Sequence, residues 1–447
     1  MTDLQRPEHP SLAQALPYWL KLGFISFGGP AGQIAMMHQE LVERRRWISE
    51  HRFLHALNYC MLLPGPEAIQ LAIYIAWLLH GIPGAIVAGV LFFLPAFALL
   101  SGLAAVYLAW GDVPLVAGIF YGIKPAVVAV VLFAAWRIGS KAIKNELLLG
   151  IALLAFIGIF HFKIGFPWIV LAAAILGVIG GKLAPAKFQG GGGHGASHKQ
   201  YGPALIDDDT PPPPHAAFSW TRLGLKLTAF VSLWAAAMLA IDGQQTLTDM
   251  GVFFTQAAFL TIGGAYAVLP YVYQGAVEQF GWLNGAQMMD GLALGETTPG
   301  PLIMVVTWVG YLGGVAKQVF ADPIAAGLAG ASVATFFTFL PSFLFILAGG
   351  PLVEATRGDL KFTAPLTAIT AAVVGVILNL AVFFAWHSFW PQATEAAPFA
   401  GPFQWLPVIV ALASFLALWK YKIDIMKVIG VCAAVGLAFT LATGAGA

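Results

Sequence analysis

Charged residues are scarce in this chain of 447 residues. Asp, Glu, Lys and Arg make up only 10% of it, whereas 59% of the residues are hydrophobic. Soluble domains carry about 25% charged residues, so the composition excludes a soluble enzyme and a disordered chain. The 22 basic and 21 acidic residues give a net charge of +1, which excludes the basic surface of a nucleic-acid-binding protein.

Cysteine is almost absent too. Cys60 and Cys432 lie in apolar runs, so the sequence has no disulfide framework or cysteine-rich metal site, and we expect both thiols to pack in the core. The polar first ten residues do not resemble a cleavable signal peptide, and the GxxxxGK[ST] motif of a nucleotide-driven pump does not occur. We therefore expect an all-α polytopic membrane protein with no metal and no cofactor.

Nine apolar runs approach the roughly 20 residues that span a bilayer. They are residues 85–109, 114–136, 147–162, 165–181, 226–241, 324–349, 362–390, 403–419 and 428–443. Four further runs are interrupted by Gly and Pro, which end helices by freeing the backbone or removing a donor. These are 11–42, broken at Phe27-Gly28-Gly29-Pro30; 53–80, broken at Pro64-Gly65-Pro66; 246–277, broken at Gly263-Gly264; and 286–317, broken at Pro299-Gly300-Pro301.

The two halves of the chain are repeats. They align without a gap for 41 residues at an offset of 235, with ten identities, and after an 11-residue insertion Pro95 meets Pro341. We predict a first repeat at 11–183, a flexible cytoplasmic linker at 184–219, a connecting transmembrane helix at 220–242 and a second repeat at 246–443. The linker holds His194, His198 and His215, which a metal could bind, but its Gly and Pro runs favour a tether.

The basic residues predict that the repeats have inverted topology, because Lys and Arg in short loops mark the cytoplasmic side. Loop 43–52 holds four arginines, whereas its counterpart 278–287 holds none. The loop after 114–136 holds Arg137, Lys141 and Lys144, and its counterpart again holds none. Nine spans with four re-entrant hairpins, their tips at the GG and PGP motifs, place 18 basic residues inside and two outside; 13 ordinary spans place 14 inside and 6 outside. We therefore expect hairpins, a cytoplasmic N-terminus and a periplasmic C-terminus.

The helix breaks predict a transport function. Irregular backbone at membrane depth is tolerated only inside protein or along a cavity, and inverted repeats with broken helices are typical of secondary transporters. The N-terminus of a half-helix binds anions through free backbone N–H groups. An anion is therefore the expected substrate. The alternative is that these motifs are kinks that permit close helix packing.

Five runs carry a resemblance to a known family. SFGGP (26–30), ERRRW (43–47), LPGPEAIQ (63–70), IGG (262–264) and TTPGP (297–301) resemble the chromate ion transporter (CHR) family, over about residues 11–180 and 246–443. The resemblance implies a carrier in the bacterial inner membrane that exports chromate through an antiport or proton-linked cycle, with sulfate as competitor. The alternatives are a carrier of another oxyanion, such as sulfate, and an assembly as a homodimer.

Substrate contacts are expected at the breaks and from neutral donors beside them. The predicted binding residues are Gly28, Gly29, Pro64, Gly65, Pro66, Gly263, Gly264, Pro299, Gly300 and Pro301, with Ser26, Gln70, Thr261, Thr297, Thr298 and Asn379. Helix capping explains the hydroxyl side chains equally well.

Few charges lie near the breaks. Lys124, midway along 114–136, is either a substrate contact or part of a structural ion pair with an acid such as Glu67. Glu67 and Glu296 are candidates for proton coupling, because a carboxylate repels an anion unless it is protonated; for Glu67 the alternative is stabilisation of a helix N-terminus.

Arg44, Arg45 and Arg46 form either an anion-attracting vestibule or a topology anchor at the lipid headgroups. Two rival functions are an anion channel and a membrane-bound chromate reductase. The reductase requires a redox cofactor or clustered ligands, for which the sequence has no CxxC motif or paired intramembrane histidines.

Overall fold

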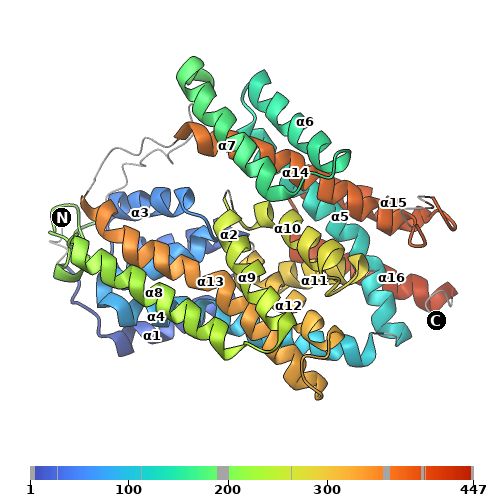
Figure 1. Ribbon diagram of the computed structural model, residues 1–447, viewed down its shortest axis with the longest axis horizontal. Helices are drawn as coiled ribbons and strands as arrows, with labels where there is room; N and C mark the ends of the chain where they lie inside the picture. Colours follow the sequence, from blue (N-terminus) through green and yellow to red (C-terminus); the bar gives the residue numbers. More distant parts are fainter. Residues whose placement is uncertain are drawn as a thin grey trace.

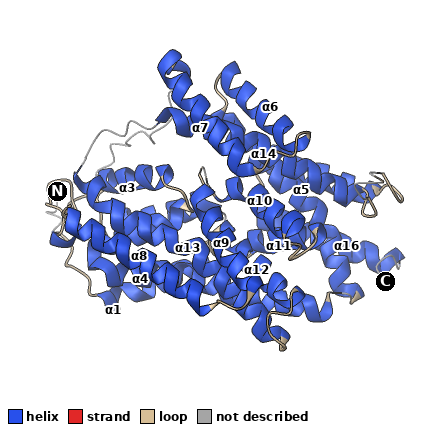
Figure 2. Cartoon of the chain, in the orientation of Figure 1, coloured by secondary structure: helices blue, strands red, loops and turns tan. Residues whose placement is uncertain are grey.

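The structure is a computed structural model that describes residues 6–27, 29–111, 113–188, 201–262, 264–355, 363–393, 397 and 399–443. Within these ranges every regular element is a helix (Figure 2), apart from one isolated bridge between Ile48 and Ile206. The predicted all-α class is confirmed. Figure 1 shows the helices as long, mostly lengthwise rods.

The helices follow the two repeats along the chain. The first half contains α1 (Leu12–Ile25), α2 (Gly29–His38), α3 (Glu50–Leu62), α4 (Glu67–Trp110), α5 (Pro114–Ala142), α6 (Glu146–Phe160) and α7 (Phe166–Leu183), followed by the connecting helix α8 (Trp220–Ala240). The second half contains α9 (Gln245–Leu260), α10 (Ala265–Tyr273), α11 (Gly285–Thr297), α12 (Val305–Ala316), α13 (Pro323–Ala355), α14 (Thr363–Phe389), α15 (Trp405–Trp419) and α16 (Ile425–Thr443). Short π-helices, η1 (Gln39–Arg44) and η4 (Gln274–Gln279), extend α2 and α10, and the 3-10 turns are η2 (Pro185–Lys187), η3 (Pro214–Ala216) and η5 (Leu302–Met304).

Helices end at the four predicted breaks. Gly29, Gly65, Gly264 and Gly300 have φ of 74°, 120°, 99° and 112°, which an L side chain disfavours, so glycine is needed to turn the chain there. Gly28 and Gly263 lie outside the described residues.

Two boundaries differ from the sequence-based prediction. The apolar arm after Pro66 and the span 85–109 form one element, α4, bent at Gly81 (φ 65°, ψ −152°); the corresponding second-half segments are two helices, α12 and α13. Helix α5 continues to Ala142, so Arg137, which was expected in a loop, lies within the helix. The predicted span ended too early because it was drawn from the apolar residues alone. The last turns of α5 are polar but still helical.

The helices pack as two bundles (Figure 1). In one bundle, α4 packs against α1 and α13, and α13 packs against α8, α9 and α12. In the other, α5 packs against α14, α15 and α16, and α14 also packs against α6 and α7. Helices α10 and α11 lie between them and contact α5, α7, α14 and α16, whereas among the described residues α2 and α3 make no contact of similar extent with that second bundle.

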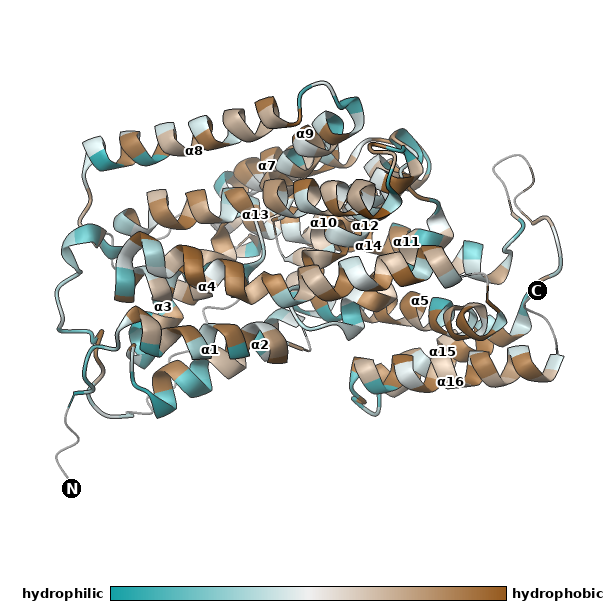
Figure 3. Ribbon diagram, turned by 90° about the horizontal axis from the view of Figure 1, so that it is seen from below, coloured by the Kyte–Doolittle hydropathy of each residue, from teal (hydrophilic) through white to brown (hydrophobic). Residues whose placement is uncertain are grey.

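The outer faces are apolar. Seven described helices are long and apolar enough to cross a membrane, namely α4, α5, α7, α8, α13, α14 and α16. Helices α6 and α15 are apolar but have only 15 residues each. Helix α8 has no buried residue and lies along one side of the molecule (Figure 3). The protein is therefore a multi-pass membrane protein.

Residues 201–217, within the segment predicted as a flexible linker, pack against the first repeat; we call them the strap. Ile206 N donates to Trp47 O at 3.0 Å, and Ser49 N donates to Ile206 O at 2.9 Å. Arg52 on α3 donates to the carbonyl of Thr210 and pairs with Glu354 at the end of α13, and Tyr74 donates to Glu354 at 2.5 Å. Thus the strap, α3 and α13 are tied together at one end of the first bundle.

Candidate functional site

Each PGP break is hydrogen-bonded to the opposite repeat. Gly65 N donates to Thr261 O at 2.7 Å, and Gly300 N donates to Ser26 O at 2.9 Å. Gly65 and Gly300 are equivalent positions, as are Ser26 and Thr261, so the two bonds exchange partners between the repeats. The four breaks therefore meet in pairs, and each pair is built from both halves of the chain.

Close packing makes these turns specific for glycine. A Cβ on Gly300 would lie 2.7 Å from the Cβ of Ala96 on α4, and a Cβ on Gly65 would lie 2.9 Å from Ser342 Oγ on α13. Ala96 and Ser342 are related by the same offset of 246 as Pro95 and Pro341. Pro64, Pro66, Pro299 and Pro301 flank the two turns. The same contact is therefore made twice, once by each repeat.

Two buried amide side chains support the turns. Gln33 Nε2 donates to Gly300 O at 2.8 Å, and Gln70 Nε2 donates to Pro64 O at 2.6 Å. The Oε1 atoms of both glutamines are buried without a hydrogen-bond partner in the described part of the chain. Gln70 was predicted from the sequence as a donor beside the break, whereas Gln33 was missed because nothing in the sequence marks it.

The hydroxyl side chains at the breaks donate within their own helices. Ser26 donates to Leu22 O and Thr261 donates to Ala257 O at 2.7 Å. Thr297 donates to Ala293 O at 3.1 Å, and Thr298 donates to Gly295 O at 3.3 Å. Since each hydroxyl has one proton, these side chains are not free to donate to an anion, whereas the first backbone N–H groups of the helices that start at the breaks have no partner within their helices.

The charged groups at the breaks form one cluster. Glu67 starts α4, and its carboxylate oxygens lie 3.7 and 3.8 Å from the position a Cβ on Gly264 would take. Two residues later, Tyr266 on α10 donates to Glu296 on α11. The guanidinium of Arg137 on α5 lies 6.0 Å from the centroid of the Tyr266 ring, close enough to attract both carboxylates. Glu67, Glu296 and Arg137 are each half-buried.

Lys124 belongs to a different cluster. Its Nζ lies 3.7 Å from Asp290 Oδ2 on α11, and Tyr107 on α4 donates to the same oxygen at 3.0 Å. Of the two alternatives for Lys124, the structure shows an ion pair, and its partner is Asp290 rather than Glu67. Asp290, with 1% exposure, escaped the sequence analysis because it lies in the middle of a helix rather than at a break.

The remaining predicted residues lie farther out or stand alone. Asn379 is half-buried on α14. Arg45 donates to Glu40 at 2.8 Å and packs on the Trp47 ring at 4.8 Å. Arg44 donates to Glu40 at 3.3 Å, and Arg46 donates to Pro203 O of the strap at 3.3 Å. Arg44 and Arg45 therefore share Glu40, whereas Arg46 binds the strap.

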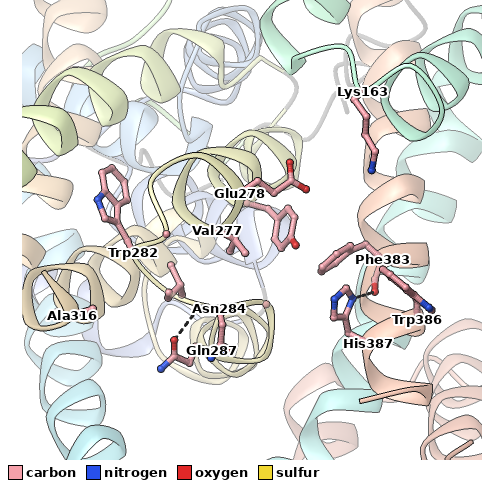
Figure 4. Close-up of a pocket in the computed structure, with 14 residues that line it drawn as sticks. Lys163, Val277, Glu278, Trp282, Asn284, Gln287, Ala316, Phe383, Trp386 and His387 are labelled. Atoms are coloured by element: carbon pink, nitrogen blue, oxygen red, sulfur yellow. Dashed lines mark hydrogen bonds between the residues drawn. The ribbon is translucent and has the colours of Figure 1, made fainter. Parts of the chain in front are cut away.

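A cavity of about 580 Å³ lies at the equivalent end of the second repeat. Glu278, Trp282, Asn284 and Gln287 line one wall, and Lys163, Phe383, Trp386 and His387 line the other (Figure 4). Trp282 and Trp47 are equivalent positions, so this cavity lies where the first repeat carries the strap. No group of three His, Cys, Asp or Glu that could hold a metal occurs among the described residues; His215 contacts Trp77 O at 2.7 Å, and His194 and His198 lie outside them.

An all-α multi-pass fold whose broken helices meet between two repeats defines a membrane transport protein. The chain belongs to the chromate transporter family: the model of that family, described as "Chromate transporter", matches residues 13–178 and 248–437. Its relatives are transport proteins rather than enzymes, and this chain is a transporter. The two matched segments fall in the two repeats.

Two chromate transport proteins are similar over most of the chain. It is 32% identical to a chromate transport protein of Pseudomonas aeruginosa over 95% of this chain and 91% of that protein. It is 30% identical to a chromate transport protein of Cupriavidus metallidurans over 85% of this chain and 84% of that protein. A shorter uncharacterized transporter of Bacillus subtilis is 28% identical over 34% of this chain and 88% of its own length. No solved structure matches.

Proposed function

We propose that this protein is a secondary active carrier that exports chromate by alternating access, holding the oxyanion at the helix breaks between the two repeats. The exchanged hydrogen bonds from Gly65 to Thr261 and from Gly300 to Ser26 carry this proposal, because they bring breaks from both repeats together. A tetrahedral dianion is suited to such a place, where several backbone N–H groups and the positive ends of helices converge.

Coupling is assigned to Glu67 and Glu296. With both carboxylates ionised, their two negative charges outweigh the one positive charge of Arg137, so the cluster repels a dianion. Protonation of both leaves one positive charge, so the cluster attracts it. Tyr266 and Cys60 are the other titratable groups that face these carboxylates. This charge balance supports proton-linked transport, with antiport against another ion as the alternative cycle.

The membrane arrangement is also a proposal. We place nine spans and four hairpins in the bacterial inner membrane, with the repeats inverted, the N-terminus and linker cytoplasmic and the C-terminus periplasmic. The domains are the repeats at 11–183 and 246–443, the linker at 184–219 and the connecting helix at 220–242. A homodimer is compatible with the apolar outer faces of α8 and α16. Cysteine labelling of position 395 from the cytoplasm would contradict this topology.

Transport in proteoliposomes tests the function. Purified protein, free of any cofactor, is reconstituted and the uptake of labelled chromate is measured with the pH gradient imposed or abolished. We expect saturable uptake that the gradient drives and that sulfate inhibits. Flux that does not saturate and ignores counter-substrate on the opposite side would indicate an anion channel. If neither chromate nor sulfate moves under any gradient, the proposed function is wrong.

A further inference from the structure

Arg137 is the one basic side chain in the charged cluster at the breaks. It lies on α5, in the second bundle, and its guanidinium reaches Tyr266 on α10 at 6.0 Å. Helices α10 and α11 are the elements that join the two bundles. Arg137 therefore brings a cation of the second bundle to the residues at the breaks.

The surroundings of Arg137 leave its donors available. It forms no ion pair with any carboxylate of the described residues, and its side chain has no hydrogen-bond partner there. Lys124 on the same helix differs, because Asp290 lies 3.7 Å from its ammonium group. A half-buried guanidinium that no described protein group engages by hydrogen bond or ion pair can direct its N–H donors at an anion.

The chemistry of the guanidinium suits an oxyanion. Its planar fork of N–H groups can bind two oxygens of a tetrahedral dianion at once, which an ammonium group cannot do. Backbone N–H groups at Gly29 and Gly264 supply partial positive charge at the breaks, and open space lies beside Gly29, where a Cβ would meet nothing within 4 Å. Arg137, beside Tyr266, adds a formal positive charge and with it the long-range attraction that the backbone lacks.

We propose that Arg137 is the substrate-binding cation of this transporter, taking the oxyanion bidentately between α5 and the N-terminal ends of α10 and α4. This inference rests on the proposed function and adds to it a specific ligand. It also assigns the second bundle, through α5, a direct contact with the substrate. Lys124, which the sequence favours, is then a structural partner of Asp290.

The test compares Arg137→Gln with Arg137→Lys, and uses Lys141→Gln as the matched control. Lys141 is exposed and lies one turn further along the same helix, so it loses the same charge away from the breaks. We expect Arg137→Gln to lower kcat/KM for chromate at least tenfold and to abolish the thermal stabilisation of the purified protein by chromate. Arg137→Lys should raise KM several-fold, and Lys141→Gln should behave as the wild type.

A double variant separates binding from charge balance. If Arg137 only compensates Glu296, then Glu296→Gln should restore chromate binding of Arg137→Gln to the wild-type level; we expect at most the partial gain that follows from removing one negative charge. Restoration, or wild-type binding and transport by Arg137→Gln, would overturn the inference while leaving the proposed function intact. If Arg137→Gln does not fold, wild-type KM in Arg137→Lys would overturn it. A wild-type protein that moves no oxyanion would instead refute the proposed function itself.

Discussion

The segments between the two breaks of each repeat are equivalent in sequence but are held differently. In the first repeat this segment runs from α2 to α3. It packs on α4, contacts the strap and is paired with α13 through Arg52 and Glu354. In the second repeat the segment runs from α10 to α11. It packs against α5, α14 and α16, and its loop borders the cavity. One repeat is therefore fastened to the first bundle while the other joins the two bundles.

Among the variants predicted here, Glu354→Ala should lower the free energy of unfolding most. It leaves the 7% exposed Arg52 without its carboxylate, and breaking a buried ion pair costs about 3–5 kcal/mol. The midpoint of thermal unfolding in detergent should fall clearly. Gln287, the second-repeat equivalent of Arg52, is the matched control, because Gln287→Ala removes only a helix cap worth about 1 kcal/mol. Equal losses would remove the difference between the segments.

Gly300→Ala should abolish most transport and destabilise the protein by about 1–3 kcal/mol, because φ is 112° and the new Cβ meets Ala96 at 2.7 Å. Gly65→Ala should do less, since its closest neighbour is the movable end of Gln70 at 2.5 Å. Chromate uptake and thermal unfolding of both variants measure the difference. Gly102→Ala, in open space on α4, should cost nothing; a loss there would point to a general intolerance of substitution.

Glu67→Gln and Glu296→Gln should flatten the pH dependence of chromate binding. A carboxylate that must be protonated makes binding weaken as pH rises, and the neutral amide removes this decline, so the variants should bind best relative to wild type at high pH. The same variants should also accumulate less chromate when a pH gradient is imposed. An unchanged pH profile in both variants would exclude these acids from coupling; a change in only one would assign coupling to one repeat.

Lys163→Gln should have the smallest effect. Lys163 lines the cavity of the second repeat, so its loss should raise KM about two- to threefold for chromate offered from that side, an effect that salt screens. Arg44→Gln should raise KM only from the opposite side. Measurements in oriented vesicles at low and high salt separate the two, and Lys422→Gln serves as a control outside the cavity. Effects that do not depend on side would contradict the placement of Lys163 and Arg44 at opposite faces of the membrane.

Sequence reasoning located the breaks but not what surrounds them. Gly65 and Gly300 were identifiable because Gly and Pro have backbone requirements that leave a local signature. Asp290 and Gln33 were not, because their roles depend on neighbours from distant helices. Arg137 was assigned to a loop since hydropathy marks the apolar part of a helix and not its last polar turns. The packing of 201–217 was hidden for a similar reason, because Pro-rich composition resembles a tether whether or not it docks.

The π-helices η1 and η4 begin at Gln39 and Gln274, an offset of 235 that equals the offset between the breaks. A π-turn arises when one residue is inserted into an α-helix. Two independent insertions would have to fall at the same position of each repeat to produce this match. We therefore infer that one insertion preceded the duplication of the repeat. A single-repeat ancestor already carried it, and the short Bacillus subtilis relative is where its descendant should be sought.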